Sequence, residues 1–105
     1  MKIAPHVSLR LQLAWLETPF SEEFRFHPVR RWRADFYIPS GRLLIEIEGG
    51  GFVQGRHSRG VGMRNDCEKY AEAMMLGYQV LRVVPDQIDN GKALEWIRKL
   101  ISVPS

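Results

Sequence analysis

The sequence has little cysteine, little histidine and no long apolar run. Its one cysteine, Cys67, excludes an intramolecular disulfide framework and a cysteine-rich zinc site, and is typical of a reducing compartment. The three histidines do not recur at metal-ligand spacing, so the sequence does not support a histidine-rich zinc site. No apolar run approaches the roughly 20 residues that a membrane span needs. We therefore expect a soluble, cytoplasmic protein with no membrane partner.

The composition is otherwise that of a folded domain. A chain of 105 residues can build one hydrophobic core and is too short for two independent domains. Its content of 45% hydrophobic and 26% charged residues excludes disordered and collagen-like classes. The net charge of +3 is compatible with a polyanionic partner. We expect residues 1–105 to form a single domain.

Hydrophobic periodicity predicts elements in the order α-β-β-β-α-β-α. Helices are predicted over 8–17, 65–77 and 90–101, with Ser8 and Asn65 as N-caps of the first two. Strands are predicted over 23–27, 31–38, 43–48 and 78–84. A glycine-rich stretch of roughly a dozen residues after the third strand predicts a loop. This order predicts an α/β fold with a mixed central sheet of about four strands flanked by helices.

The second and third strands are expected to form a hairpin that gathers carboxylates. If the turn is a two-residue loop at Ser40 and Gly41, Asp35 lies directly opposite Glu46. Directly opposed side chains have Cβ atoms roughly 4.5 to 5.5 Å apart, a separation at which like charges destabilise a sheet. Glu48 adds a third carboxylate on the same face as Glu46. Either one group is protonated or a cation binds, and carboxylate oxygens are ligands that Mg²⁺ takes.

The same carboxylates also fit a solvated sheet face. In that interpretation Arg31 and Arg33 form ion pairs with Glu46 and Glu48 across the strands, and the protein is structural or binds another protein. A bulge at Gly41 would change the register and separate the two opposed acids.

Arginines surround the hairpin in the sequence. Guanidinium groups bind phosphates bidentately, and glycine lets a backbone approach a ligand closely. The candidates for contact with nucleic acid are Arg33, Arg56, Arg59 and Arg64. His57, in the same stretch, can act as a general acid or base near neutral pH, the alternative being an ordinary surface residue.

The motifs and their order resemble a nuclease superfamily. The similar segments are WRADF at 32–36, IEIEGG at 45–50 and YQVLRV at 78–83, with a helix between the last two. Together they resemble the PD-(D/E)xK nucleases, and more closely the small proteins similar to the very-short-patch-repair endonuclease. The resemblance covers about residues 23–87. It implies a restriction-endonuclease-like fold and a Mg²⁺-dependent endonuclease that hydrolyses DNA, with Mn²⁺ as the alternative ion and RNA as the alternative substrate.

The resemblance also implies a role for individual residues. Asp35 and Glu46 would bind the metal, and the main-chain carbonyl of Ile47 would complete its shell. Glu48 would assist catalysis or bind a second ion, although the family usually has a lysine here that orients or deprotonates the attacking water. Lys69, on the following helix, is our candidate for that lysine, the alternative being an ordinary solvated surface lysine.

Two residues are alternatives to Lys69 in this role, namely Arg64 and His57. The missing motif lysine also fits a nuclease-derived module that binds nucleic acid with little or no cleavage. The first helix offers no acid to carry over except Glu17, to which we assign no role. The sequence has no dimer signature and leaves a homodimer open. We interpret Cys67 and Met74 as buried core residues of the second helix.

Overall fold

The computed structural model describes residues 3–49 and 55–102, and over 55–60 it describes the backbone alone. The first half contains α1 (Pro5–Leu16), β1 (Ser21–Arg25), β2 (Arg33–Ile38), a 3₁₀ turn (Pro39–Gly41) and β3 (Leu43–Ile47). The second half contains α2 (Gly55–Met75), β4 (Gln79–Val83), α3 (Pro85–Asp89) and α4 (Lys92–Ile101). This order confirms the predicted α/β class and adds the short helix α3.

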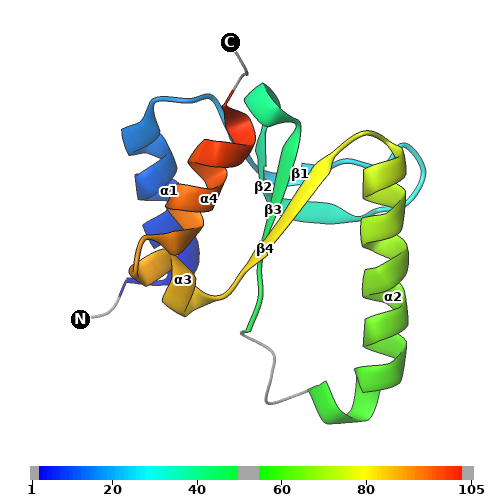
Figure 1. The fold of residues 1–105 in the computed structure, drawn as a ribbon. Helices are drawn as coiled ribbons and strands as arrows, with labels where there is room; N and C mark the ends of the chain where they lie inside the picture. The colour runs from blue at the N-terminus through cyan, green and yellow to red at the C-terminus, as the bar shows by residue number, and fades with distance from the viewer. Residues whose placement is uncertain (1–2, 50–54, 103–105) are drawn as a thin grey trace.

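The four strands form one mixed sheet in the order β1-β2-β3-β4. The pairs β1–β2 and β2–β3 are antiparallel, whereas β3 and β4 are parallel. A parallel pair needs a long crossover connection, and α2 provides it. Figure 1 shows α2 on one side of the sheet and α1, α3 and α4 on the other. None of the described helices is long and apolar enough to span a membrane.

The larger hydrophobic core lies between the sheet and the helices α1, α3 and α4. Its fully or almost fully buried members come from six elements: Leu9, Leu13, Phe36, Ile38, Leu43, Ile45, Val83, Ile88, Ala93 and Ile97. Burial of apolar surface in such a cluster is the main favourable term in folding. This face of the sheet therefore provides most of the stability.

The core on the α2 side is smaller and more aromatic. Its buried residues are Phe26, Ala34, Leu44 and Ala73. Partly buried aromatic rings surround them, including Phe24 stacked on Tyr37 with ring centroids 4.2 Å apart. Among the α2 residues whose side chains are described, Ala73 is the one in this core. The turn of α2 before Ala73 can therefore present polar side chains to the sheet.

The strand β2 changes the face on which its even-numbered residues lie. The sequence predicts that Ala34, Phe36 and Ile38 share one face, and this is wrong. Ala34 packs in the core on the α2 side, whereas Phe36 and Ile38 pack in the other core. The change coincides with Glu23 of β1, which lies across from Asp35 and has a φ of 52°. A left-handed residue interrupts the regular alternation of its own strand, here β1, directly beside the point at which β2 changes face.

The helix α1 begins earlier than predicted. Pro5 occupies its first turn, with Ala4 as the N-cap, so Ser8 lies inside the helix and does not cap it. Proline suits this position because its missing N–H would have had no partner within the helix. The earlier start brings His6 into the helix.

The helix α2 also begins earlier, at Gly55, so the predicted loop up to Asn65 is wrong over its second half. A glycine in a helix costs about 1 kcal/mol relative to alanine. Once a helix is nucleated, each further residue adds a backbone hydrogen bond, so a 21-residue helix tolerates three glycines.

The predicted apolar stripe of α2 is wrong as well. Cys67 and Met74 are exposed, and the fully buried residue of this helix among those described is Ala73. Residues three and four positions before Ala73 share its helix face. Those positions are Tyr70 and Lys69, so α2 presents polar groups to the sheet.

Candidate functional site

The hairpin of β2 and β3 has the register that the sequence predicts. Phe36 pairs with Ile45, and the same register places Asp35 across from Glu46. The turn itself differs: it is a 3₁₀ turn followed by Arg42 in the left-handed region, with a φ of 47°. Asp35 is fixed to β3 by its own side chain, because its Oδ2 accepts a hydrogen bond of 2.7 Å from the backbone N–H of Ile47.

Glu46 and Lys69 form a shielded ion pair between β3 and α2. The Nζ of Lys69 lies 2.9 Å from the Oε2 of Glu46, and the two side chains are 16% and 13% exposed. Burial raises the pKa of Glu46 above its ordinary value, and the Lys69 hydrogen bond opposes this shift. The charges of Asp35 and Glu48 raise the pKa of Glu46 further. Asp35 and Glu48 therefore both act electrostatically on Glu46.

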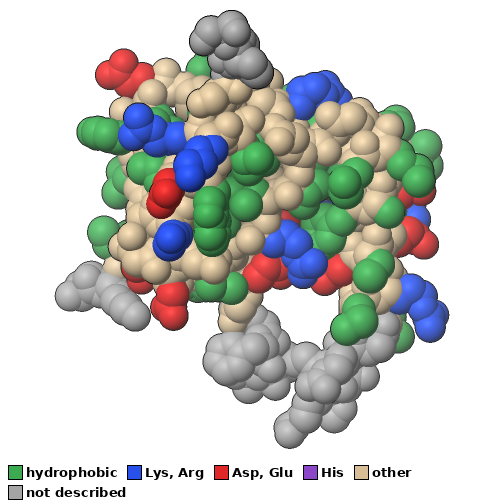
Figure 2. All heavy atoms as spheres, in the orientation of Figure 1, with side chains coloured by type: hydrophobic (Ala, Val, Ile, Leu, Met, Phe, Trp, Pro, Cys, Tyr) green, Lys and Arg blue, Asp and Glu red, His purple; other side chains and the backbone are tan. Residues whose placement is uncertain are grey.

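Glu48 is held by two donors from different elements. Its Oε2 accepts a hydrogen bond of 3.2 Å from the Tyr70 hydroxyl and one of 2.9 Å from the Nε of Arg82. The Arg82 guanidinium also lies 4.6 Å from the centroid of the Tyr70 ring. Burial raises the pKa of Tyr70, so its phenol is a neutral donor. Figure 2 shows side chains of both charges meeting between β4 and α2.

The arginines do not form the ion pairs of the alternative interpretation. Glu46 and Glu48 pair with Lys69 and Arg82, not with Arg31 and Arg33. Arg33 is exposed, and its Nη1 lies 3.9 Å from Glu23 Oε1.

The other predicted basic residues lie on α2. Arg64 is exposed. Arg56, His57 and Arg59 belong to the part of α2 whose side chains lie outside the description. Contact of these residues with phosphates and a catalytic role for His57 stay predictions.

A second group of potential ligands shares Asp35. One ligand atom each of His6, Glu23 and Asp35 lie within 4.8 Å of one another. The three residues come from α1, β1 and β2. The sequence gives no sign of this group, because His6 stands outside the predicted helix and the pairing of β1 with β2 cannot be counted from a tight turn. Pro5 could have placed His6 in the helix, because proline favours the first helical position.

Sequence reasoning also misses Tyr70 and Arg82. Tyr70 follows Lys69 directly, and its helical spacing suggests only a core residue. Arg82 is placed by the parallel pairing of β4 with β3, in which it lies beside Glu46. A parallel register is set by the crossover and its packing, so no local signal in the sequence identifies this arginine.

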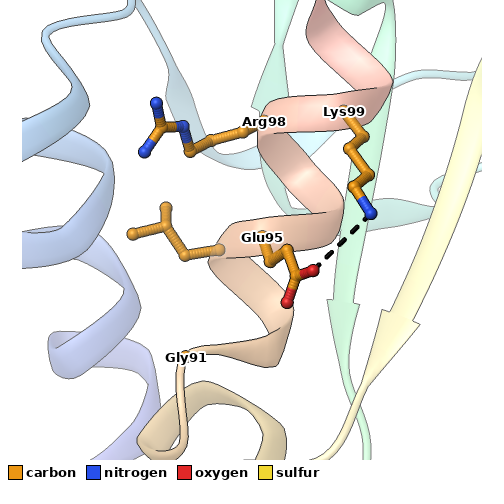
Figure 3. A pocket seen from close by; sticks show the side chains of 5 residues that line it. Gly91, Glu95, Arg98 and Lys99 are labelled. Atoms are coloured by element: carbon orange, nitrogen blue, oxygen red, sulfur yellow. Dashed lines mark ion pairs between the residues drawn. The ribbon is translucent and has the colours of Figure 1, made fainter.

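A pocket elsewhere on the surface contains none of the predicted site residues. It lies along α4 and is lined by Gly91, Leu94, Glu95, Arg98 and Lys99, as Figure 3 shows. Glu95 and Lys99 form an exposed ion pair of 3.5 Å there. This pair offers the same residue types as Glu46 and Lys69, without their burial.

The donors near Asp35 are of the chemical type that hard divalent cations bind. Asp35, Glu46 and Glu48 supply carboxylate oxygens. Their mutual repulsion contributes to the raised pKa of Glu46, although Lys69 is only 2.9 Å away. A bound cation would offset that repulsion.

The fold is similar to that of a known nuclease domain. The solved structure of the homing endonuclease I-Bth0305I catalytic domain superposes with a TM-score of 0.66, over 94% of this chain and 94% of that domain. The sequences are 20% identical, so the likeness concerns the fold. No protein-family model and no curated protein matches the sequence. The chain thus has the α/β fold of a nuclease catalytic domain, as the resemblance in the sequence implies.

Proposed function

We propose that this protein is a metal-dependent endonuclease that hydrolyses DNA phosphodiester bonds. The observation that carries the proposal is the shielded contact of Lys69 with Glu46, beside Asp35, on a sheet with the fold of a homing endonuclease catalytic domain. The fold likeness supports nuclease chemistry, and the carboxylates and lysine supply groups that such chemistry uses.

In this proposal Asp35, Glu46 and the main-chain carbonyl of Ile47 hold a Mg²⁺ or Mn²⁺ ion. The bound ion would polarise the phosphoryl group and stabilise the negative charge that develops on it. The hydrogen bond from the Ile47 N–H fixes the Asp35 carboxylate before any ligand arrives. Such preorganisation avoids reorganisation of the site during the reaction.

Lys69 takes the place of the missing motif lysine in this proposal. Its ammonium group donates to Glu46 and has two further N–H donors, which can orient the attacking water or contact a phosphate oxygen. Glu48 cannot do this as a carboxylate, and Tyr70 and Arg82 already hold it. In our proposal Glu48 assists catalysis or binds a second ion.

A second function is favoured by the same contacts of Glu48. An acidic residue locked by two donors at the motif lysine's position suits a nuclease-derived module that binds nucleic acid without cleaving it. The arginines at positions 33, 56, 59 and 64 would then contact phosphates, as we also propose for the endonuclease.

A cleavage panel tests the proposal. The purified chain is incubated with single-stranded, duplex and branched DNA in Mg²⁺ or in Mn²⁺. We expect cleavage of at least one form, and we expect Glu46→Gln and Lys69→Met to lower its rate about 100-fold or more. The matched controls Glu95→Gln and Lys99→Met remove the same groups from the exposed pair on α4 and should leave the rate unchanged. DNA binding without any cleavage would favour the binding module, and neither binding nor cleavage would overturn both functions.

A further inference from the structure

His6, Glu23 and Asp35 converge on one point from three elements. Their potential ligand atoms, one from each residue, lie within 4.8 Å of one another. Glu23 is exposed, whereas His6 and Asp35 are partly buried. A single divalent ion with ligands at about 2.0 to 2.2 Å can bridge atoms at such separations after small side-chain rotations.

The backbone holds two members of this group in place. Glu22 pairs with Phe36 and Phe24 pairs with Ala34, so Glu23 and Asp35 lie across from each other in the antiparallel pair. Asp35 uses Oδ2 to accept the Ile47 N–H, which leaves Oδ1 for another partner. The carboxylates of Glu23 and Asp35 carry like charges, and Arg33 offsets this only from 3.9 Å at the exposed end of Glu23.

The imidazole of His6 is oriented from outside the group. Its Nε2 lies 3.0 Å from Glu22 Oε1, and Arg10 Nε lies 3.0 Å from the other oxygen of that carboxylate. Carboxylate oxygens accept hydrogen bonds, so in this contact the ring donates from Nε2 to Glu22, and Nδ1 is the ring nitrogen left to coordinate a metal ion.

A carboxylate that accepts the N–H of one ring nitrogen while the other nitrogen binds metal is the usual environment of a metal-binding histidine. Glu22 and Arg10 supply this environment to His6. The His6 ring also packs against Phe36, with centroids 4.6 Å apart, which limits its rotation.

We propose that His6, Glu23 and Asp35 form a site for a divalent transition-metal ion. The site rests on the proposed function in one respect, since it shares Asp35 with the Mg²⁺ ligands proposed above. Its donor set differs, because an imidazole nitrogen favours first-row transition-metal ions over Mg²⁺, with Ni²⁺ and Zn²⁺ bound more strongly than Mn²⁺. The chain would therefore bind Mn²⁺ in the presence of excess Mg²⁺, through His6 and Glu23.

Calorimetric titration of the full chain with Mn²⁺, at fixed pH and in excess Mg²⁺, tests this site without any DNA. We expect Glu23→Gln to weaken Mn²⁺ binding at least tenfold. Glu17→Gln is the matched control, because Glu17 is also an exposed glutamate with a left-handed backbone, at a φ of 60°. The control should bind Mn²⁺ as the wild type does.

A second measurement needs no variant. Substoichiometric Mn²⁺ is added to the wild-type chain, and the imidazole resonances are followed by NMR. We expect the paramagnetic ion to broaden the signals of His6. The signals of His27, which is hydrogen-bonded to Glu72 on α2, should stay sharp. Unchanged His6 signals, or equal Mn²⁺ affinity in Glu23→Gln and wild type, would overturn the proposed site.

The outcomes separate this site from the nuclease proposal. Loss of Mn²⁺ affinity in Glu23→Gln supports the site even if the wild-type chain cleaves no DNA. Conversely, cleavage in Mg²⁺ that needs Glu46, together with Mn²⁺ binding that is indifferent to Glu23, would support the nuclease and overturn the site.

Discussion

The two faces of the sheet are covered in different ways. Among the residues whose side chains are described, the side of α1, α3 and α4 holds ten buried residues that form one apolar core. Of the same described residues, the α2 side holds four that are buried in its core, and beside these lie Lys69 with Glu46 and Tyr70 with Glu48. The face of α1, α3 and α4 therefore serves stability, and the α2 face carries the groups that can take part in chemistry. Charged groups are costly inside an apolar core and need partners where they are shielded.

The largest effect should come from the apolar face. Leu13→Ala removes a fully buried side chain of α1 and should lower the free energy of unfolding by about 2 to 5 kcal/mol. Leu11→Ala, on the same helix but 56% exposed, should change it by less than about 0.5 kcal/mol. Urea denaturation measures both. Equal losses in the two variants would contradict the assignment of the main core to this face.

The stability of the protein should depend on pH through Glu46, which lies on the α2 face. The pKa of Glu46 is raised in the folded state, so the folded chain holds that proton more tightly than the unfolded chain. The resulting stability is present below the ordinary value of 4.5 and is lost as the pH rises through the folded pKa. Glutamine does not ionise, so the stability of Glu46→Gln relative to the wild type should increase as the pH rises from below 4.5 through the raised pKa of Glu46.

Thermal denaturation of the wild type and of Glu46→Gln over that pH range measures the difference in their stability. The exposed Glu95→Gln variant is the control and should differ from the wild type by a nearly constant amount. A constant difference for Glu46→Gln as well would show that burial of this carboxyl has no effect on stability.

The smallest effect should come from Tyr70→Phe. It removes the hydroxyl that donates to Glu48 but keeps the ring under Arg82. We expect a loss of about 0.5 to 1.5 kcal/mol in the free energy of unfolding. Tyr37→Phe, which keeps its stacking on Phe24, is the matched control and should cost less. An equal cost in both variants would mean that the hydrogen bond from Tyr70 to Glu48 contributes nothing measurable to the free energy of unfolding.

Much of the fold could be predicted because its signals are local. Alternating apolar residues in 43–48 and β-prone residues in 78–84 define two strands, and a short turn near Gly41 fixes the register that places Asp35 across from Glu46. The start of α2 could not be predicted from its glycines, since helix propensity is a weak preference that the rest of a helix overrides. The exposure of Cys67 was missed because spacing alone does not say which side of a helix meets the sheet.

The sequence by itself determined the order of the elements apart from α3, the hairpin and the proximity of Asp35 to Glu46, because turns and alternation act over a few residues. The tertiary structure decided which partners these carboxylates have. Lys69, Tyr70 and Arg82 reach Glu46 and Glu48 through the packing of α2 and the parallel register of β4, and His6 and Glu23 meet Asp35 through the packing of α1 and β1. Such contacts join residues far apart in the chain, so they depend on how elements pack and not on any local pattern.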